Sequence, residues 1–153
     1  MLSVWITGAS SGIGEACAYR YAEEGARLAL TSSSADRLET VATKCRQLGA
    51  EEVTIFPFDL TCPDGIDDLT DKVWNALGGI DIVMLNAGIS QRTNVEDTSM
   101  EMVRKIMEIN YFAPVAIAKR LLPGMSARGG GKIAVTTSIA GRFGFPLRCG
   151  YSS

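Results

Sequence analysis

Apolar residues along this chain fall into short continuous runs that alternate with longer stretches in which they recur every three or four positions. A short apolar run bounded by turn residues is typical of a buried strand, whereas the recurring pattern is typical of a helix with an apolar face. The runs predict strands at Leu2–Thr7, Arg27–Thr31, Val53–Phe58, Asp81–Leu85 and Lys132–Thr137. The stretches between them predict helices at Ile13–Glu24, Ala35–Leu48, Asp64–Leu77 and Ser99–Leu122.

Strands and helices therefore alternate, and the strands are apolar along almost their whole length. Such strands belong to a parallel sheet that helices cover on both faces. Because crossovers between parallel strands are right-handed, the expected fold is an α/β, Rossmann-type doubly wound sheet in a three-layer αβα arrangement. A chain of 153 residues amounts to about one domain and contains no linker, so we expect residues 1–153 to form a single domain.

The last predicted helix is the longest, and Pro114 in its interior should bend or break it, because proline lacks the amide hydrogen that a helix uses. Its apolar residues occupy more than one face, which exceeds what packing on a single sheet requires. These residues are Met102, Val103, Ile106, Met107, Ile109, Phe112, Val115, Ala116 and Leu121. This surplus of apolar residues favours self-association through the helix. The alternative is a helix that is buried deep in the core of the monomer.

Charge and composition exclude several classes of function. Fifteen Lys and Arg residues against seventeen Asp and Glu residues leave a net charge of -2, which provides no basic surface for nucleic acid or for an anionic membrane. No apolar run approaches the roughly 20 residues of a membrane helix. The chain has no histidine, which excludes Ser-His-Asp and Cys-His catalysis and histidine-rich zinc sites. We expect no metal, and any general acid or base must be Tyr, Lys, Asp, Glu or Cys.

The cysteines indicate a reducing compartment. Cys17, Cys45, Cys62 and Cys149 are irregularly spaced and form no C-x-x-C pair, so we expect free thiols rather than a disulfide framework. The first predicted strand follows Met1 directly, which leaves no room for a targeting peptide. These observations predict a cytoplasmic location.

A glycine-rich turn joins the first predicted strand to the first helix. Glycines let the backbone turn sharply and approach phosphates closely, and the helix N-terminus offers free N–H groups with partial positive charge. In this strand–turn–helix context the turn predicts a site for the pyrophosphate of a dinucleotide. The residues concerned are Thr7, Gly8, Ser10, Ser11, Gly12, Ile13 and Gly14.

The glycine spacing G-x-x-x-G-x-G resembles that of the short-chain dehydrogenase/reductase family. Further motifs of that family follow in the same order over the whole chain, although Leu85 stands where the family carries an asparagine. The motif residues are Asp59 and Leu60, Asn86, Ala87 and Gly88, then Asn110, Ser138 and Tyr151.

The resemblance implies a role for each motif. Asp59 would bind the adenine amino group, Asn110 would hold a water molecule in a proton relay, and Ser138 would orient a carbonyl group. Tyr151 would contact the cofactor and act as acid and base, which requires a nearby cation because a phenol titrates near pH 10. The family's lysine falls at position 155, beyond Ser153, so the chain resembles the N-terminal part of a protein of about 250 residues and is expected to be inactive alone.

The end of the second predicted strand bears on the choice of cofactor. It carries no carboxylate that would bind a ribose 2′-hydroxyl and repel a 2′-phosphate. Hydroxyls and a nearby cation are present instead, in Ser32, Ser33, Ser34 and Arg37. The absence of the repulsive group favours NADP(H) over NAD(H).

These residues together predict an NADP(H)-dependent oxidoreductase that interconverts a carbonyl and a hydroxyl group of a small molecule and forms a homodimer or homotetramer at full length. By resemblance, Ala140–Arg148 would line an apolar substrate wall, although core packing explains the same side chains equally well. The alternative function is a catalytically inactive nucleotide-binding regulator or scaffold of the same fold. A nucleotide-sugar epimerase is disfavoured because its G-x-x-G-x-x-G spacing is absent.

Overall fold

A five-stranded parallel sheet runs through the computed structural model, which describes residues 1–152. The strands lie in the order β3-β2-β1-β4-β5, so the chain steps outward from β1 in one direction and then in the other. Their register pairs Val4 of β1 with Leu28 of β2 and with Ile82 of β4. The bounds are β1 (Ser3–Thr7), β2 (Arg27–Ser32), β3 (Glu52–Pro57), β4 (Ile82–Leu85) and β5 (Lys132–Val135).

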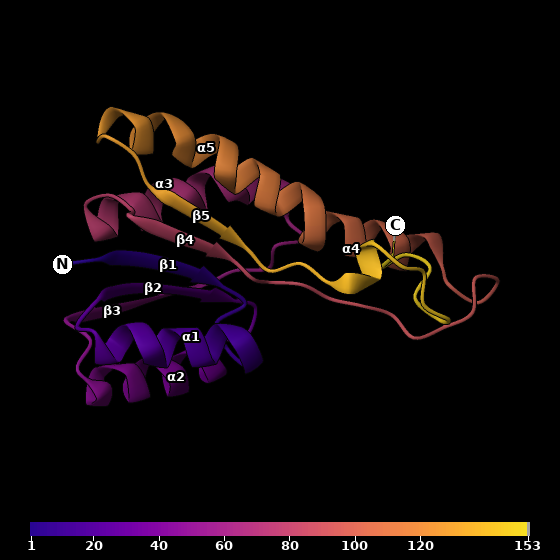
Figure 1. Cartoon of the computed structure of the whole chain (residues 1–153), viewed down its shortest axis with the longest axis horizontal. Coiled ribbons are helices and arrows are strands. Elements are labelled where there is room, and N and C mark those ends of the chain that lie inside the picture. The colour runs from indigo at the N-terminus through magenta and orange to yellow at the C-terminus, as the bar shows by residue number, and fades with distance from the viewer. Residues whose placement is uncertain (153) are drawn as a thin grey trace.

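Helices cover both faces of this sheet (Figure 1). One face carries α1 (Gly12–Glu23) and α2 (Ala35–Leu48), which pack on each other, and the opposite face carries α3 (Ile66–Leu77) and α5 (Ala113–Ala127). The predicted doubly wound α/β sheet is thereby confirmed. The sheet is incomplete on the C-terminal side, where β5 is an edge strand and all its residues are exposed.

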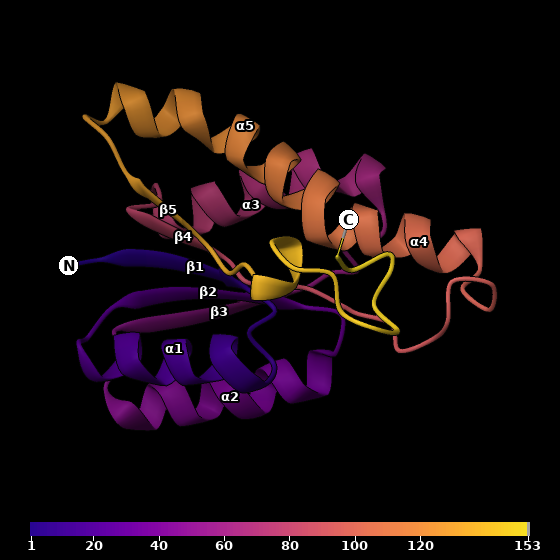
Figure 2. The ribbon, with the colours of Figure 1, turned by 45° about the vertical axis from the view of Figure 1, so that its right-hand side comes forward.

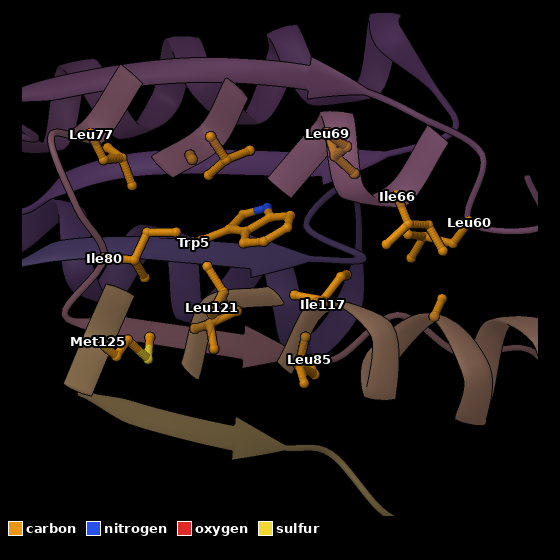
Figure 3. Packing of buried hydrophobic residues seen from close by; sticks show 14 of the residues in the cluster. Trp5, Leu60, Ile66, Leu69, Leu77, Ile80, Leu85, Ile117, Leu121 and Met125 are labelled. Atoms are coloured by element: carbon orange, nitrogen blue, oxygen red, sulfur yellow. The ribbon is translucent and has the colours of Figure 1, made fainter. Parts of the chain in front are cut away.

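Two apolar clusters fill the spaces between the sheet and its helices. Trp5 lies at the centre of one cluster, between side chains of α3 such as Leu69 and side chains of α5 such as Leu121 (Figure 3). Its indole Nε1 donates a hydrogen bond to Thr31 Oγ1 at 2.9 Å. Val4 and Ile6, the neighbours of Trp5 in β1, point into the other cluster, beneath α1 and α2. Because both faces of β1 are buried, its sequence is apolar without alternation.

The long helix differs from the prediction. Ser99 begins it as expected, since Ser99 Oγ accepts a hydrogen bond from Met102 N at 3.1 Å. The helix then consists of α4 (Met100–Met107), a π-helical turn (Glu108–Phe112) and α5, which continues past the predicted end at Leu122 and through Pro123. Pro114 lies in the first turn of α5, where a missing amide hydrogen costs little. The irregularity expected at Pro114 therefore occurs in the turn just before it.

Smaller differences concern the ends of elements. A 3₁₀ turn at Pro63–Gly65 occupies the predicted start of the third helix, so α3 begins at Ile66. Strands β3 and β5 end earlier than predicted, which places Phe58, Thr136 and Thr137 in the connections that follow the sheet. Within residues 1–152, no helix has the length and apolar character needed to cross a bilayer.

Candidate functional site

A cavity of about 680 Å³ lies where the parallel strands end, beside the point at which the strand order reverses between β1 and β4. In open α/β sheets this edge is the usual ligand site. Residues that follow β1, β2, β3, β4 and β5 all contribute to its walls. The predicted site residues that line it are Gly8, Ser10, Ser11, Ile13, Ser32, Ser33, Leu60, Asn86, Ala87, Gly88, Asn110, Ser138 and Tyr151.

The glycine-rich turn forms one end of the cavity. Gly8 has a left-handed φ of +66°, and a Cβ atom there would lie 2.7 Å from Ala87 Cα. A Cβ atom at Gly14 would lie 2.3 Å from Gly8 O and 2.7 Å from Asn86 Nδ2. Glycine is therefore required at both positions for α1 to begin this close to the ends of β1 and β4. The first amides of α1 have no helical acceptor, so the turn fits the phosphates of a dinucleotide.

Thr7 and Asn86 clamp the strand ends behind that turn. Thr7 is 2% exposed, and its Oγ1 accepts hydrogen bonds from Asn86 N at 3.1 Å and Ala87 N at 3.2 Å. Asn86 Nδ2 donates to Gly8 O at 3.4 Å, and Asn86 Oδ1 accepts from Thr136 Oγ1 at 2.9 Å. Asn86 thus links β1, β4 and β5 and also faces the cavity. Thr7 lies outside the lining and supports it from behind.

Asn110 lies in the π-helical turn. Its Oδ1 accepts a hydrogen bond from Ile89 N at 2.9 Å, and its Nδ2 donates to Ile89 O at 2.9 Å. Both polar atoms of the side chain therefore hold the backbone of the segment that follows β4. Single π-helical turns inside α-helices are frequent at functional sites, and here the turn directs Asn110 toward the sheet.

Ser138 and Tyr151 line the same cavity as Asn110. Ser138 follows β5 and begins the 3₁₀ turn Ile139–Gly141, and its Oγ accepts a hydrogen bond from Ala140 N at 3.2 Å. Tyr151 is half-buried in a turn in which its amide donates to Arg148 O at 3.0 Å. The three predicted catalytic residues thus come from three different elements and line one cavity.

Some predicted cofactor contacts lie outside the lining of the cavity. Asp59 Oδ1 accepts hydrogen bonds from Thr61 N at 3.0 Å and Thr61 Oγ1 at 2.8 Å, and the bond from the amide most strongly lowers the pKa of Asp59. Ser34 precedes α2, where its amide donates to Ser32 Oγ at 3.2 Å, and Arg37 is exposed on α2. The predicted residues outside the lining are Thr7, Gly12, Gly14, Ser34, Arg37 and Asp59.

The predicted substrate wall is largely wrong for this part of the chain. Of Ala140–Arg148, only Gly141 lines the cavity, whereas Phe143 is 63% exposed and Phe145 is 47% exposed. The same exposure excludes core packing for these two side chains.

Other lining residues carry no motif. They belong to α4, the π-helical turn, the start of α5, the ends of strands and the connections after β3, β4 and β5. The predicted strand ends could have indicated those that neighbour a motif residue. They are Phe58, Leu85, Ile89, Ser90, Ile106, Met107, Ile109, Tyr111, Pro114, Val135, Thr136, Thr137, Gly141 and Gly150. No charged side chain is among the described residues that line the cavity.

Comparison with known proteins identifies the family. The profile of the family described as short chain dehydrogenase matches residues 3–153. Dehydrogenase/reductase SDR family member 7 of Homo sapiens is 40% identical over 151 residues, which are 97% of this chain and 44% of that protein. The chain therefore spans about half the length of such relatives.

Solved structures agree with this result. An alcohol dehydrogenase from the archaeon Thermococcus sibiricus, complexed with 5-hydroxy-NADP, superposes with a TM-score of 0.89 and 33% identity over 99% of this chain and 64% of its own. An NAD+-bound xylitol dehydrogenase superposes with a TM-score of 0.91 and 29% identity over 99% of this chain and 58% of its own. The chain therefore belongs to the short-chain dehydrogenase/reductase family.

Proposed function

We propose that the full-length protein is a nicotinamide-dependent oxidoreductase that interconverts a carbonyl and a hydroxyl group, with Tyr151 as the acid and base. One observation carries the proposal: a single cavity is lined both by residues of the glycine-rich turn and by Asn110, Ser138 and Tyr151. Similar proteins were solved with 5-hydroxy-NADP and with NAD+, which supports a nicotinamide cofactor.

In the direction of carbonyl reduction, each of these residues has a separate role. The cofactor, when bound, supplies the hydride that the carbonyl carbon accepts. Tyr151 donates its phenolic proton to the carbonyl oxygen, and Ser138 Oγ donates a hydrogen bond to the same oxygen, where negative charge develops. Asn110 keeps the backbone of Ile89 in place beside them. Proton donation near neutral pH requires a cation beside the phenol, the role that the family resemblance gives to a lysine at position 155.

NADP(H) is the preferred cofactor in this proposal. Ser32 and Ser33 line the cavity after β2, and the described lining contains no carboxylate that would repel a 2′-phosphate. Hydroxyl groups bind such a phosphate without a Coulombic penalty. The neighbouring structures do not decide the choice, since one holds an NADP derivative and another holds NAD+.

The proposal also includes self-association of the full-length protein through α4 and α5. The buried side of α5 packs on Trp5 and its cluster, while the opposite side is exposed. Large apolar side chains exposed along α4, the π-helical turn and α5 include Met102, Phe112, Val115 and Leu122. A surface of this kind on several helical turns is typical of a subunit interface.

The test compares the full-length protein with its Tyr151→Phe variant. NADPH oxidation is followed with a panel of ketones and aldehydes, and NADPH binding is measured by fluorescence. We expect kcat to fall about 10²–10⁴-fold while NADPH still binds, because only the proton donor is lost. An unchanged kcat would refute Tyr151 as the acid. Binding of NADPH without turnover of any carbonyl compound by the wild type would instead favour the inactive regulator or scaffold.

A further inference from the structure

Gln91 is a buried polar residue that contacts the turn carrying Tyr151. It lies in the connection between β4 and α4, and only 6% of it is exposed. Figure 2 shows the C-terminal segment beside this connection and beside α4, and the arrangement in Figure 1 is the same. A buried amide side chain requires hydrogen-bond partners, since an unpaired one is costly.

The partners of Gln91 are two backbone amides just before Tyr151. The side-chain amide is assigned the orientation in which its oxygen faces the turn, because the reverse would set its NH₂ group against two N–H donors. Gln91 Oε1 then accepts hydrogen bonds from Cys149 N at 3.0 Å and from Gly150 N at 2.8 Å. The next two amides, of Tyr151 and Ser152, donate to Arg148 O at 3.0 Å and 2.8 Å. Cys149 and Gly150 lie at the start of this turn, so Gln91 holds the start of the turn from a distant segment.

The same two segments are joined at further points. Thr93 N donates to Leu147 O at 3.2 Å, Arg148 donates to Ser90 Oγ, and Cys149 Sγ lies 3.6 Å from Thr98 Oγ1. These contacts are exposed or half-buried, whereas the Gln91 amide is buried. Gln91 is therefore the interior contact between the connection and the turn.

The connection itself is held against the catalytic end of the cavity. Asn110 binds both the amide and the carbonyl group of Ile89, which lies two residues before Gln91. On the other side, a Cβ atom at Gly150 would lie 3.4 Å from Ile106 Cδ1, so the turn packs closely on α4. A continuous set of contacts thus runs from Asn110 through Ile89 and Gln91 to the peptide unit before Tyr151.

We infer that Gln91 is a positioning residue, which fixes the Tyr151 hydroxyl relative to Ser138 by holding the amides of Cys149 and Gly150. This inference rests on the proposed function of Tyr151 as acid and base. Displacement of a catalytic group by about 1 Å costs on the order of 10²-fold in rate. Removal of the acceptor should therefore lower kcat much more than it weakens NADPH binding, because the glycine-rich turn lies between β1 and α1, outside this set of contacts.

The test uses three variants of the full-length protein. Gln91→Leu keeps the volume and removes the acceptor, and Gln91→Glu keeps an acceptor oxygen at the same place. Thr70→Val is the matched control, because it removes another buried hydrogen bond, from Thr70 Oγ1 to Ile66 O at 2.7 Å in α3, away from the cavity. Measured quantities are kcat, KM for NADPH, Tm and the hydrogen exchange of the peptide spanning residues 147–152.

We expect Gln91→Leu to lower kcat at least tenfold, with KM for NADPH within twofold of wild type and faster exchange in the 147–152 peptide. Gln91→Glu should recover at least a third of the wild-type kcat, and Thr70→Val should lower Tm without changing kcat or this exchange. If Gln91→Leu does not fold, Gln91→Met replaces it, since its flexible side chain fills the space without a strong acceptor.

Two outcomes overturn the inference. One is a Gln91→Leu variant that loses Tm as Thr70→Val does but keeps kcat within twofold. The other is unchanged exchange in the 147–152 peptide, which is decisive even if the wild type reduces no carbonyl compound. If the wild type reduces no carbonyl compound, the proposed function fails, but the exchange data still report whether Gln91 holds the turn.

Discussion

At Gly14 the backbone lies so close to Gly8 O that a residue with a Cβ atom would not fit. We predict that Gly14→Ala destabilises the protein by about 1–3 kcal/mol and abolishes NADPH binding, since the new methyl group would overlap Gly8 O and push α1 away from the strand ends. Thermal unfolding and fluorescence titration with NADPH measure both effects.

The matched control for this prediction is Gly144→Ala, because a Cβ atom at Gly144 meets nothing within 4 Å. It should leave both Tm and NADPH binding unchanged. Normal NADPH affinity in the Gly14→Ala variant would show that the cofactor does not bind at the glycine-rich turn.

Ser33 allows a direct test of cofactor preference. We expect Ser33→Asp to reduce the ratio of kcat/KM for NADPH to kcat/KM for NADH at least tenfold, because a carboxylate close to a 2′-phosphate repels it. Ser33→Asn has a side chain of nearly the same size without the charge, so it should change this ratio much less. Equal shifts in the two variants would contradict the placement of the 2′-phosphate beside Ser33.

Some residues of the site could be predicted from the sequence, and others could not. Gly8, Asn86 and Ser138 could be predicted to share one cavity, because each follows a strand of a parallel sheet and such ends meet at one edge. Gln91 could not be predicted, since its partners are backbone amides 58 and 59 positions away and no local pattern indicates that contact.

The π-helical turn is the element on which the catalytic end of the cavity depends. It inserts an extra residue into one turn between α4 and α5, and it contains both the buried Ile109 and Asn110, which lines the cavity. Periodicity over the whole predicted helix had only indicated apolar residues on more than one face. A local change of phase and a second buried surface give the same sequence pattern, which is why the turn was not predicted.

We predict that Asn110→Ala destabilises the protein by roughly 1–3 kcal/mol, because Ile89 N and Ile89 O both lose their partner. The activity of the full-length protein should fall as well, since the connection that carries Gln91 is released. Denaturant unfolding and kcat measure the two effects. Asn94→Ala removes an exposed amide that lies 3.3 Å from Asp97 Oδ2, and it should change stability by no more than about 0.5 kcal/mol. Comparable losses in the two variants would exclude a special role for Asn110.

At the scale of the whole molecule, the parallel sheet and both helical layers were predicted correctly, because apolar patterning and the right-handed crossover leave few alternatives. Exposure was not predictable in the same way. The apolar residues of the long helix were compatible with deep burial or with an interface, and the structure places Phe112 and Val115 at the surface.

We therefore predict that the full-length protein is a dimer or tetramer at micromolar concentration and that Val115→Glu shifts it toward monomer. A carboxylate at the centre of an apolar interface loses its hydration without gaining a partner. Sedimentation velocity measures the shift. Thr43→Glu, which adds the same charge to the exposed side of α2, should leave the association unchanged. A monomeric wild type would refute the interface.

The central place of β1 affects how this chain can fold during its synthesis. Of the five described strands, β1 is synthesised first and its partner β4 much later, as the hydrogen bond from Ser3 N to Asp81 across 78 positions illustrates. Until β4 and α5 have emerged, Trp5 lacks the apolar neighbours that cover it. Nascent chains that end before β4 should therefore expose this indole to water and depend on chaperones, and its fluorescence would report the length at which the core closes.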